Sequence, residues 1–295
     1  MNIIINHIRS FNRRRLTRRH LKKTLVGARL WRPKRIYRRY MLAQSYYRPQ
    51  LKMIKSWAFK DTEYSNFYYD LKILNIEHMT HAISVITNLE HKIIARYIEE
   101  IRTDDWLKKL ILKNLKSSDY PKDTKVEFAR RIGWYAIARA IKPKVIVETG
   151  VHNGVGACVL TRALMKNSEE GILGEYFGTD IDESAGQLLT SPLSDYGKIL
   201  YGDSITSLGK LNYTIDLFIN DSDHSETYEQ QEYEIVNEKL SSNAIILGDN
   251  SHVTDKLSKF SLKTNRKFIF IPEKPKDHWY PGAGIGVSYI HPQNQ

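Results

Sequence analysis

The sequence predicts an α/β protein with a doubly wound, mostly parallel sheet of seven strands, preceded by a helical extension. From residue 144 onward, short apolar runs of β-rich composition alternate with helical segments. Helices of about 8–15 residues are expected between the first five runs, which is typical of a doubly wound parallel sheet. No convincing helix separates the last two runs, which predicts a terminal antiparallel hairpin. The predicted strands are 144–148, 174–180, 198–203, 215–221, 243–249, 266–273 and 284–290.

Three organisational parts are expected: residues 1–60, 61–142 and 143–295. The middle part is predicted to be helical and to pack on or cover the core. Apolar side chains at helical spacing predict a helix over 82–101, and acidic residues at its start favour a second helix over 104–115. A third helix is expected over 126–141, ended by Pro143. The stripe of the first helix consists of Ile83, Ile86, Leu89, Ile93, Tyr97 and Ile101.

Charge is distributed very unevenly along the chain. Residues 1–60 contain 18 of the 45 Lys and Arg and none of the 33 Asp and Glu, so the remaining chain holds 27 basic against 33 acidic side chains. We call residues 1–60 the basic arm and expect it to be partly helical or disordered, with a short amphipathic helix carrying Ile4, Ile8 and Phe11. A basic arm suits an anionic membrane surface or another phosphate-rich partner, nucleic acid being the less favoured one.

The composition also bears on location. No stretch approaches the roughly 20 apolar residues of a membrane span, and no apolar signal region follows the first charges. One cysteine, Cys158, excludes an intrachain disulfide. We therefore expect a cytoplasmic protein that could lie peripherally at a membrane, although an Arg-rich mitochondrial presequence would have similar composition.

Five successive predicted strands end at an acidic residue. In open α/β sheets the ligand crevice lies at the carboxyl ends of the strands, so these side chains are expected to share one site. Such an acidic rim would repel a pyrophosphate, and the glycines at 150, 154 and 156 do not have dinucleotide spacing. A cationic nucleoside without phosphate, such as S-adenosylmethionine, fits better. The five acids are Glu148, Asp180, Asp203, Asp221 and Asp249.

Four segments in order resemble the motifs of class I S-adenosylmethionine-dependent methyltransferases: VETGVHNG, FGTDID, YGDSI and IDLFINDSDH. The resemblance covers about residues 125–291, and the basic arm and the helical region before residue 120 have no counterpart. It implies residues that shape a pocket for the methionine part of the cofactor, a carboxylate that binds its ribose, and a pair of residues beside its adenine. The cofactor-binding residues implied are Glu148, Gly150, Gly154, Asp180, Asp203, Ser204 and Asp221.

Within this class, residues 215–250 are similar to small-molecule O-methyltransferases of the catechol type and of the macrocin and cephalosporin-tailoring group. The resemblance implies an acceptor hydroxyl on a small molecule or glycan. Asn220 before Asp221 and Gly248 before Asp249 depart from the pattern, which leaves the pocket shape open. Methyltransferases that act on nucleic-acid bases often carry an (N/D)-P-P-(Y/F) turn at the end of the fourth strand, and this sequence has no prolines there, so that alternative is less favoured. A non-catalytic binding module on the same fold is also less favoured, because it would not be expected to keep the full set of strand-end acids.

Two devices would help a hydroxyl lose its proton. Asp221, Asp249 and Asn250 would offer oxygen ligands to Mg²⁺, although Asp249 and Asn250 would equally suit a helix N-cap. His224, three residues after Asp221, would serve as general base, or it is a hydrogen-bonded loop residue. Further candidates for the acceptor pocket are His252, His278, Trp279, Tyr280 and the tyrosines of residues 66–70, each of which could instead lie on the surface or in the core.

Overall fold

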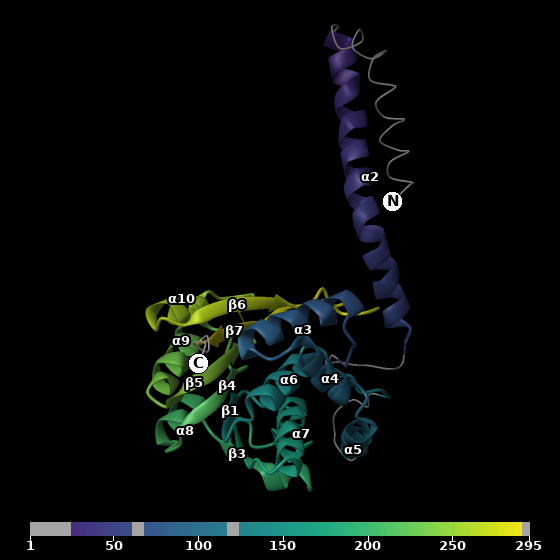
Figure 1. Cartoon of the computed structure of the whole chain (residues 1–295). Helices are drawn as coiled ribbons and strands as arrows, with labels where there is room; N and C mark the ends of the chain where they lie inside the picture. The colour runs from purple at the N-terminus through teal and green to yellow at the C-terminus, as the bar shows by residue number, and fades with distance from the viewer. Residues whose placement is uncertain (1–24, 61–67, 117–123, 250, 291–295) are drawn as a thin grey trace. The chain divides into compact units, whose positions relative to one another are not determined.

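The computed structural model describes residues 25–60, 68–116, 124–249 and 251–290, and the chain divides into two units (Figure 1). The first unit is Met1–Phe59 and the second is Lys60–Gln295. In the first unit, α2 (Leu25–Ala58) is one helix with Pro33 and Pro49 inside it. The amphipathic helix expected around Ile4, Ile8 and Phe11 lies outside the described residues.

Four helices precede the sheet in the second unit: α3 (Ile73–Thr87), α4 (His91–Arg102), α5 (Asp105–Lys116) and α6 (Arg131–Ile141). The single helix predicted over 82–101 is wrong, because Asn88 adopts a left-handed conformation with φ 55° and separates α3 from α4. Asparagine tolerates that conformation better than most residues. The acidic start of α5 was predicted correctly, since Asp104 Oδ1 accepts from the N–H of Leu107 at 2.9 Å.

The seven-stranded sheet confirms the predicted fold class. Its order is β3-β2-β1-β4-β5-β7-β6; β1 to β5 pair in parallel, and β7 pairs antiparallel with both β5 and β6. The order reverses beside β1, with β2 on one side and β4 on the other. The strands are β1 (Val145–Thr149), β2 (Glu175–Asp180), β3 (Gly197–Tyr201), β4 (Ile215–Asn220), β5 (Leu240–Gly248), β6 (Lys267–Pro272) and β7 (Gly284–Tyr289).

The connections between the strands follow the prediction except between β2 and β3. There the chain forms turns and a short 3-10 helix, η2 (Leu193–Tyr196), instead of a helix of the expected length. Gly186, at φ +75°, and Pro192 interrupt this segment, and neither favours a helix interior. The remaining helices are α7 (Val155–Glu169), α8 (Ser204–Lys210), α9 (Glu226–Asn237) and α10 (Lys256–Lys263).

The sheet separates two apolar clusters, as the alternation of side chains along a strand requires. Ile146 packs with Trp134 of α6 and Leu160 of α7, whereas its neighbour Val147 belongs to the opposite cluster with Tyr233 of α9. Figure 1 shows α6 and α7 on one side of the sheet and α8 and α9 on the other. This packing leaves the carboxyl ends of the parallel strands available for a site. None of the helices in the described part of the chain has the length and apolarity that a bilayer-spanning segment needs.

Candidate active site

The carboxyl ends of β1, β2 and β4 surround a cavity of about 420 Å³. Five of the predicted cofactor-binding residues line it: Gly150, Asp180, Asp203, Ser204 and Asp221. These residues come from separate strand ends and meet because parallel strands direct their carboxyl ends to one edge. The other lining residues are His152, Thr179, Ile181, Asp182, Ala185, Gly202, Ser222, Asp223 and Tyr228.

Gly150 follows β1, and the backbone just after the neighbouring strand β4 comes very close to it. A Cβ at this position would lie 2.0 Å from the carbonyl oxygen of Asp221, and the φ of +79° is in the left-handed region. Both observations require glycine. The N–H of Gly150 donates to the Thr179 carbonyl at 2.9 Å, and the N–H of Asp221 donates to the Thr149 carbonyl at the same distance. The loop is therefore held between the ends of β2 and β4.

Asp180 and Asp203 are held in place by hydrogen bonds. Asp180 accepts from the N–H of His152 at 2.8 Å and from the N–H of Asp182 at 2.9 Å. Asp203 caps α8 by accepting from the N–H and the hydroxyl of Thr206, both at 2.8 Å, and it also accepts from Tyr228 at 2.7 Å. Hydrogen bonds from Tyr228 and Thr206 lower the pKa of Asp203, so it is an anion at neutral pH.

Asp221 and Asp249 interact directly at the ends of β4 and β5. Arg130 binds Asp249 through both oxygens, with Nε donating to Oδ1 and Nη2 donating to Oδ2 at 2.5 Å. Burial and the neighbouring Asp249 raise the pKa of Asp221 well above its ordinary value of 3.8. Burial would also raise the pKa of Asp249, but Arg130 outweighs it and the pKa of Asp249 falls. Asp249 is therefore the anion of the pair, and Asp221 is the carboxyl group that retains its proton readily.

These contacts do not fit the predicted Mg²⁺ site. A divalent cation needs free carboxylate oxygens, whereas both oxygens of Asp249 accept from the guanidinium of Arg130. Arg130 already supplies the positive charge that a metal would bring to Asp249. The third predicted ligand, Asn250, lies outside the described residues.

Glu148, near the end of β1, is not in the cavity wall. It is only 1% exposed and accepts from the hydroxyl of Tyr176 at 2.6 Å. Burial raises its pKa to about 7. A Cβ on Gly156 would lie 2.3 Å from Oε1 of Glu148, so that glycine makes room for the carboxyl group. Gly154 is the N-cap of α7 and packs on Gly186, outside the cavity lining.

The histidines predicted for the site are not in the cavity wall. His224 is exposed in the loop after β4, and His252 is exposed after β5. His278 is buried, and its Nδ1 accepts from the N–H of Tyr280 at 3.0 Å. The rings of His278, Trp279, Tyr280 and Tyr69 form an aromatic group beside Arg130 and Glu273. Tyr68 and Tyr69, the described tyrosines of residues 66–70, are part of the core.

Sequence reasoning missed Glu232 on α9, which contacts the cavity-lining residues Ser204 and Ser222 from behind the wall. This carboxyl group is fully buried and accepts from Ser222 at 2.8 Å, from Thr149 at 3.1 Å, and from Ser204 and Asn220. Burial raises its pKa to about 7, although the hydrogen bonds from the serines and Thr149 oppose the increase. Glu232 thus joins the ends of β1 and β4 to the start of α8.

The comparisons agree with the geometry. Residues 147–251 match the family model described as a methyltransferase domain. The match spans about a third of the chain, over the strands β1 to β5. The match agrees with the resemblance to methyltransferases that the sequence motifs indicate. A comparison with curated proteins found no match.

Solved methyltransferase structures are also similar to this chain. A methyltransferase from Geobacter sulfurreducens has 20% identity over 53% of this chain and 76% of its own, with a TM-score of 0.41. The S-adenosylhomocysteine-bound PaMTH1 from Podospora anserina has 16% identity over 61% and 87%, with a TM-score of 0.46. The O-methyltransferase TomG from Streptomyces achromogenes, solved with S-adenosylmethionine, has 13% identity over 68% and 96%, with a TM-score of 0.49. At these scores the similarity carries no statement about the substrate.

Proposed function

We propose that this protein transfers a methyl group from S-adenosylmethionine to a hydroxyl of a small molecule or glycan, with Asp221 as the proton acceptor. The observation that carries the proposal is the position of Asp221. It lines the cavity at the end of β4, and burial together with Asp249 raises its pKa. The pKa of a general base must lie near the working pH, and an ordinary aspartate is too acidic.

The cavity suits a cationic nucleoside. Asp180, Asp182, Asp203, Asp221 and Asp223 all line it, and the described residues of its wall include no Lys or Arg. A polyphosphate would find no positive partner there, whereas a sulfonium would be attracted. Asp180 keeps its carboxylate fixed by two backbone N–H groups, as a group that accepts from ribose hydroxyls must be. Asp203 and Ser204 are expected beside the adenine.

S-adenosylmethionine supplies a methyl group bound to a positively charged sulfur. A positive charge beside Asp221 lowers the pKa of that side chain, so Asp221 loses its proton when the cofactor binds. The Asp221 carboxylate would then accept the proton of the acceptor hydroxyl, while the cofactor would supply the methyl group and keep the electron pair of the broken carbon–sulfur bond on sulfur. Asp249 keeps its charge through Arg130 and thereby stays a poor proton acceptor.

The acceptor is expected between the cavity and the aromatic group of Trp279 and Tyr280. Both side chains are partly exposed; burial raises the pKa of Tyr280, and the charges of Arg130, Glu273 and Asp249 also influence it. Aromatic side chains bind the apolar faces of sugar or phenol rings, which supports a ring-bearing acceptor. His224 stays an untested alternative as the base.

Isothermal titration calorimetry tests the role of Asp221. Cofactor is titrated in two buffers of different ionisation enthalpy, so that the difference in heat gives the protons released. Wild type should release up to one proton with S-adenosylmethionine and fewer with S-adenosylhomocysteine, whose sulfur is neutral. D221N should remove that difference. A difference that persists in D221N contradicts the proposal.

Activity gives the second test. S-adenosylhomocysteine formation is measured over a panel of phenols, sugars and glycosides. D221N should lower kcat by about 10²- to 10⁴-fold, the usual contribution of a general base. H224A is the matched comparison, since His224 is three residues away and exposed. A loss in H224A with full activity in D221N would make His224 the base.

For the basic arm we propose an anionic lipid surface. The described side chains of α2 include Arg32, Lys34, Arg35, Arg38 and Arg39 and no acid, and the neighbouring Tyr37 and Tyr40 are more than half exposed. Cations next to exposed aromatic side chains favour the membrane interface. The full chain should sediment with phosphatidylserine vesicles and not with neutral ones. Salt-dependent binding to RNA without vesicle binding would instead favour a nucleic-acid partner.

A further inference from the structure

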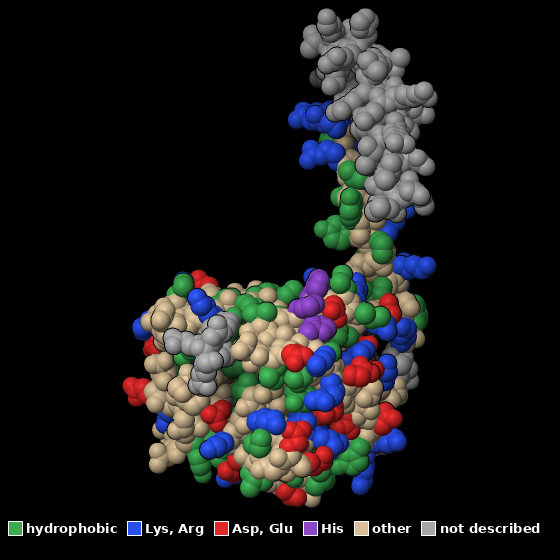
Figure 2. All heavy atoms as spheres, in the orientation of Figure 1, with side chains coloured by type: hydrophobic (Ala, Val, Ile, Leu, Met, Phe, Trp, Pro, Cys, Tyr) green, Lys and Arg blue, Asp and Glu red, His purple; other side chains and the backbone are tan. Residues whose placement is uncertain are grey.

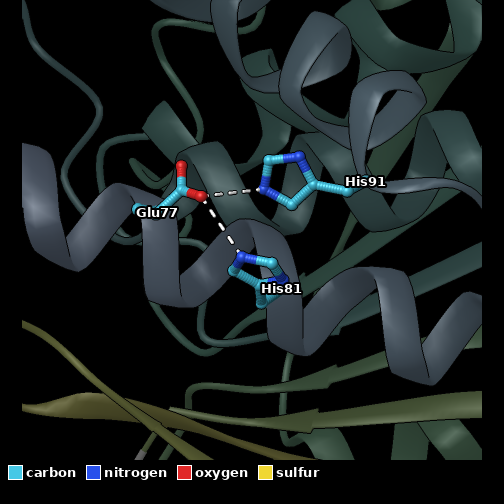
Figure 3. A group of neighbouring side chains, drawn as sticks. All are labelled: Glu77, His81 and His91. Atoms are coloured by element: carbon cyan, nitrogen blue, oxygen red, sulfur yellow. Dashed lines mark ion pairs between the residues drawn. The ribbon is translucent and has the colours of Figure 1, made fainter.

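Two histidines and a glutamate meet on the surface of the helices α3 and α4, away from the methyl-transfer cavity. Glu77 and His81 are four residues apart on α3, and His91 is the first residue of α4. Figure 3 shows the three side chains pointing toward one another, with His91 reaching back from the next helix. Figure 2 shows histidine side chains gathered at one place on the surface of the second unit.

The distances suit a tetrahedral metal ion. Oε1 of Glu77 lies 3.2 Å from Nε2 of His81 and 3.2 Å from Nε2 of His91. Zinc binds nitrogen and oxygen ligands at about 2.0–2.2 Å, so neighbouring ligand atoms in a tetrahedral site are about 3.3 Å apart. All three ligand atoms lie within 4.8 Å of one another. Only the distance between the two histidines has to shorten, by at most about 1.5 Å relative to that tetrahedral edge.

His91 supplies an independent observation. Its Nε2 is enclosed and makes no hydrogen bond to any residue that the structure describes, although Oε1 of Glu77 is close. An enclosed polar atom without a hydrogen bond is costly. A metal ion would satisfy the lone pair of this nitrogen when the proton is on Nδ1.

The turn between the helices holds His91 in place. Asn88 is left-handed and ends α3, and the hydroxyl of Ser84 donates to the carbonyl of Leu89 at 2.6 Å. The turn that precedes α4 is thereby tied back to α3. The rings of His81 and His91 lie 4.3 Å apart between centroids. The ligands therefore come from two segments that the fold already brings together.

We propose that Glu77, His81 and His91 bind Zn²⁺, with water as the fourth ligand. Two imidazoles and one carboxylate favour zinc over Mg²⁺ or Ca²⁺, which prefer oxygen ligands only. Among the described residues, this is the one group of three or more His, Cys, Asp or Glu side chains with ligand atoms this close. The ion would fasten the start of α4 to the middle of α3. The competing explanation is an ion pair between Glu77 and protonated histidines.

Calorimetric titration of the full chain, freed of any affinity tag, with ZnCl₂ tests the site. Wild type should bind one ion per chain. H81A and H91A should weaken binding by at least about tenfold, since outer-shell ligand partners alone change metal affinity by 10–100-fold. The matched control is H78A, because His78 is exposed on the same helix and outside the group. Its affinity should equal that of wild type.

Two further measurements separate a site from adsorption at the surface. Zinc at ten times the wild-type Kd should raise the Tm of wild type and H78A by about 3–6 °C, and that of H81A by no more than about 1–2 °C. Co²⁺ in place of zinc should give the visible absorption of a four-coordinate ion. Absence of zinc binding by wild type, or equal affinity in H81A and wild type, overturns the proposal. Neither result depends on the methyl-transfer activity.

Discussion

Replacing Arg130 by methionine would remove the positive partner of two buried carboxylates, Asp249 and Glu273. The guanidinium donates to both oxygens of Asp249 and lies 3.5 Å from Oε2 of Glu273. The side chains of Arg130, Asp249 and Glu273 are 13%, 6% and 0% exposed. Methionine has similar length and no charge, so R130M leaves the carboxylates in place without their shared donor.

The cost follows from the burial. Removing one partner of a buried ion pair usually destabilises a protein by about 3–5 kcal/mol, because the remaining charge is unpaired in a poorly solvated place. For a folded unit of this size the Tm should fall by about 10 °C. In wild type the pKa of Asp249 is lowered in the folded state. Its contribution to the free energy of unfolding is therefore present above the pKa of the unfolded state, near 4, and is lost as the pH falls through the pKa of the folded state. The difference in free energy of unfolding between wild type and R130M should therefore increase as the pH rises above about 4.

Urea unfolding of wild type, R130M, D249N and the double variant measures this effect. The double variant should be more stable than R130M, because it removes the unpaired charge along with its partner. The coupling energy of the cycle isolates the pair. A loss of less than about 1 kcal/mol in the unfolding free energy of R130M, or no gain in stability in the double variant, would refute the assignment of Arg130 as the counter-charge of Asp249.

Two further changes test the supports of the cavity. Burial raises the pKa of Glu232 to about 7 from 4.5, so the protonated form is favoured in the folded state and stability falls as the pH rises from about 4.5 to 7, by about 3 kcal/mol. The pKa values of Glu148 and Asp221 are also raised, so E232Q should remove only part of this slope in urea unfolding at several pH values, and an unchanged slope would contradict the assignment. G150A should abolish cofactor binding, because its Cβ would lie 2.0 Å from the Asp221 carbonyl. G171A has a similar φ of +83° and no atom within 4 Å, so it should keep binding, and equal effects of the two variants would exclude the steric explanation.

The sequence was informative where local pattern and topology agree. Alternating runs predicted the parallel sheet, and the rule that ligands bind at carboxyl strand ends brought Gly150, Asp180, Asp203 and Asp221 to one cavity. The terminal hairpin was also predicted, from the lack of a helical segment between its strands. These features depend on short-range composition and on one general property of α/β sheets.

Other features depend on contacts that no local pattern contains. Arg130 lies 119 residues before Asp249, and an arginine at the start of a helix looks like an ordinary surface residue. Glu232 looked like one of several acids on the solvated face of α9, yet it is fully buried. The break at Asn88 was missed because Ile86, Leu89 and Ile93 continue the apolar spacing across it. Its only local signal was the asparagine itself.

The central claim is that S-adenosylmethionine occupies the cavity at the ends of β1, β2 and β4, with Asp180 holding the ribose. Calorimetric titration with S-adenosylmethionine should give one site in wild type. Loss of two hydrogen bonds to a carboxylate predicts a Kd about 100-fold weaker in D180A. E183Q is the matched control and should bind like wild type, because Glu183 is an exposed acid three residues away and outside the cavity wall. No binding by wild type, or equal Kd values for D180A and E183Q, would contradict the account.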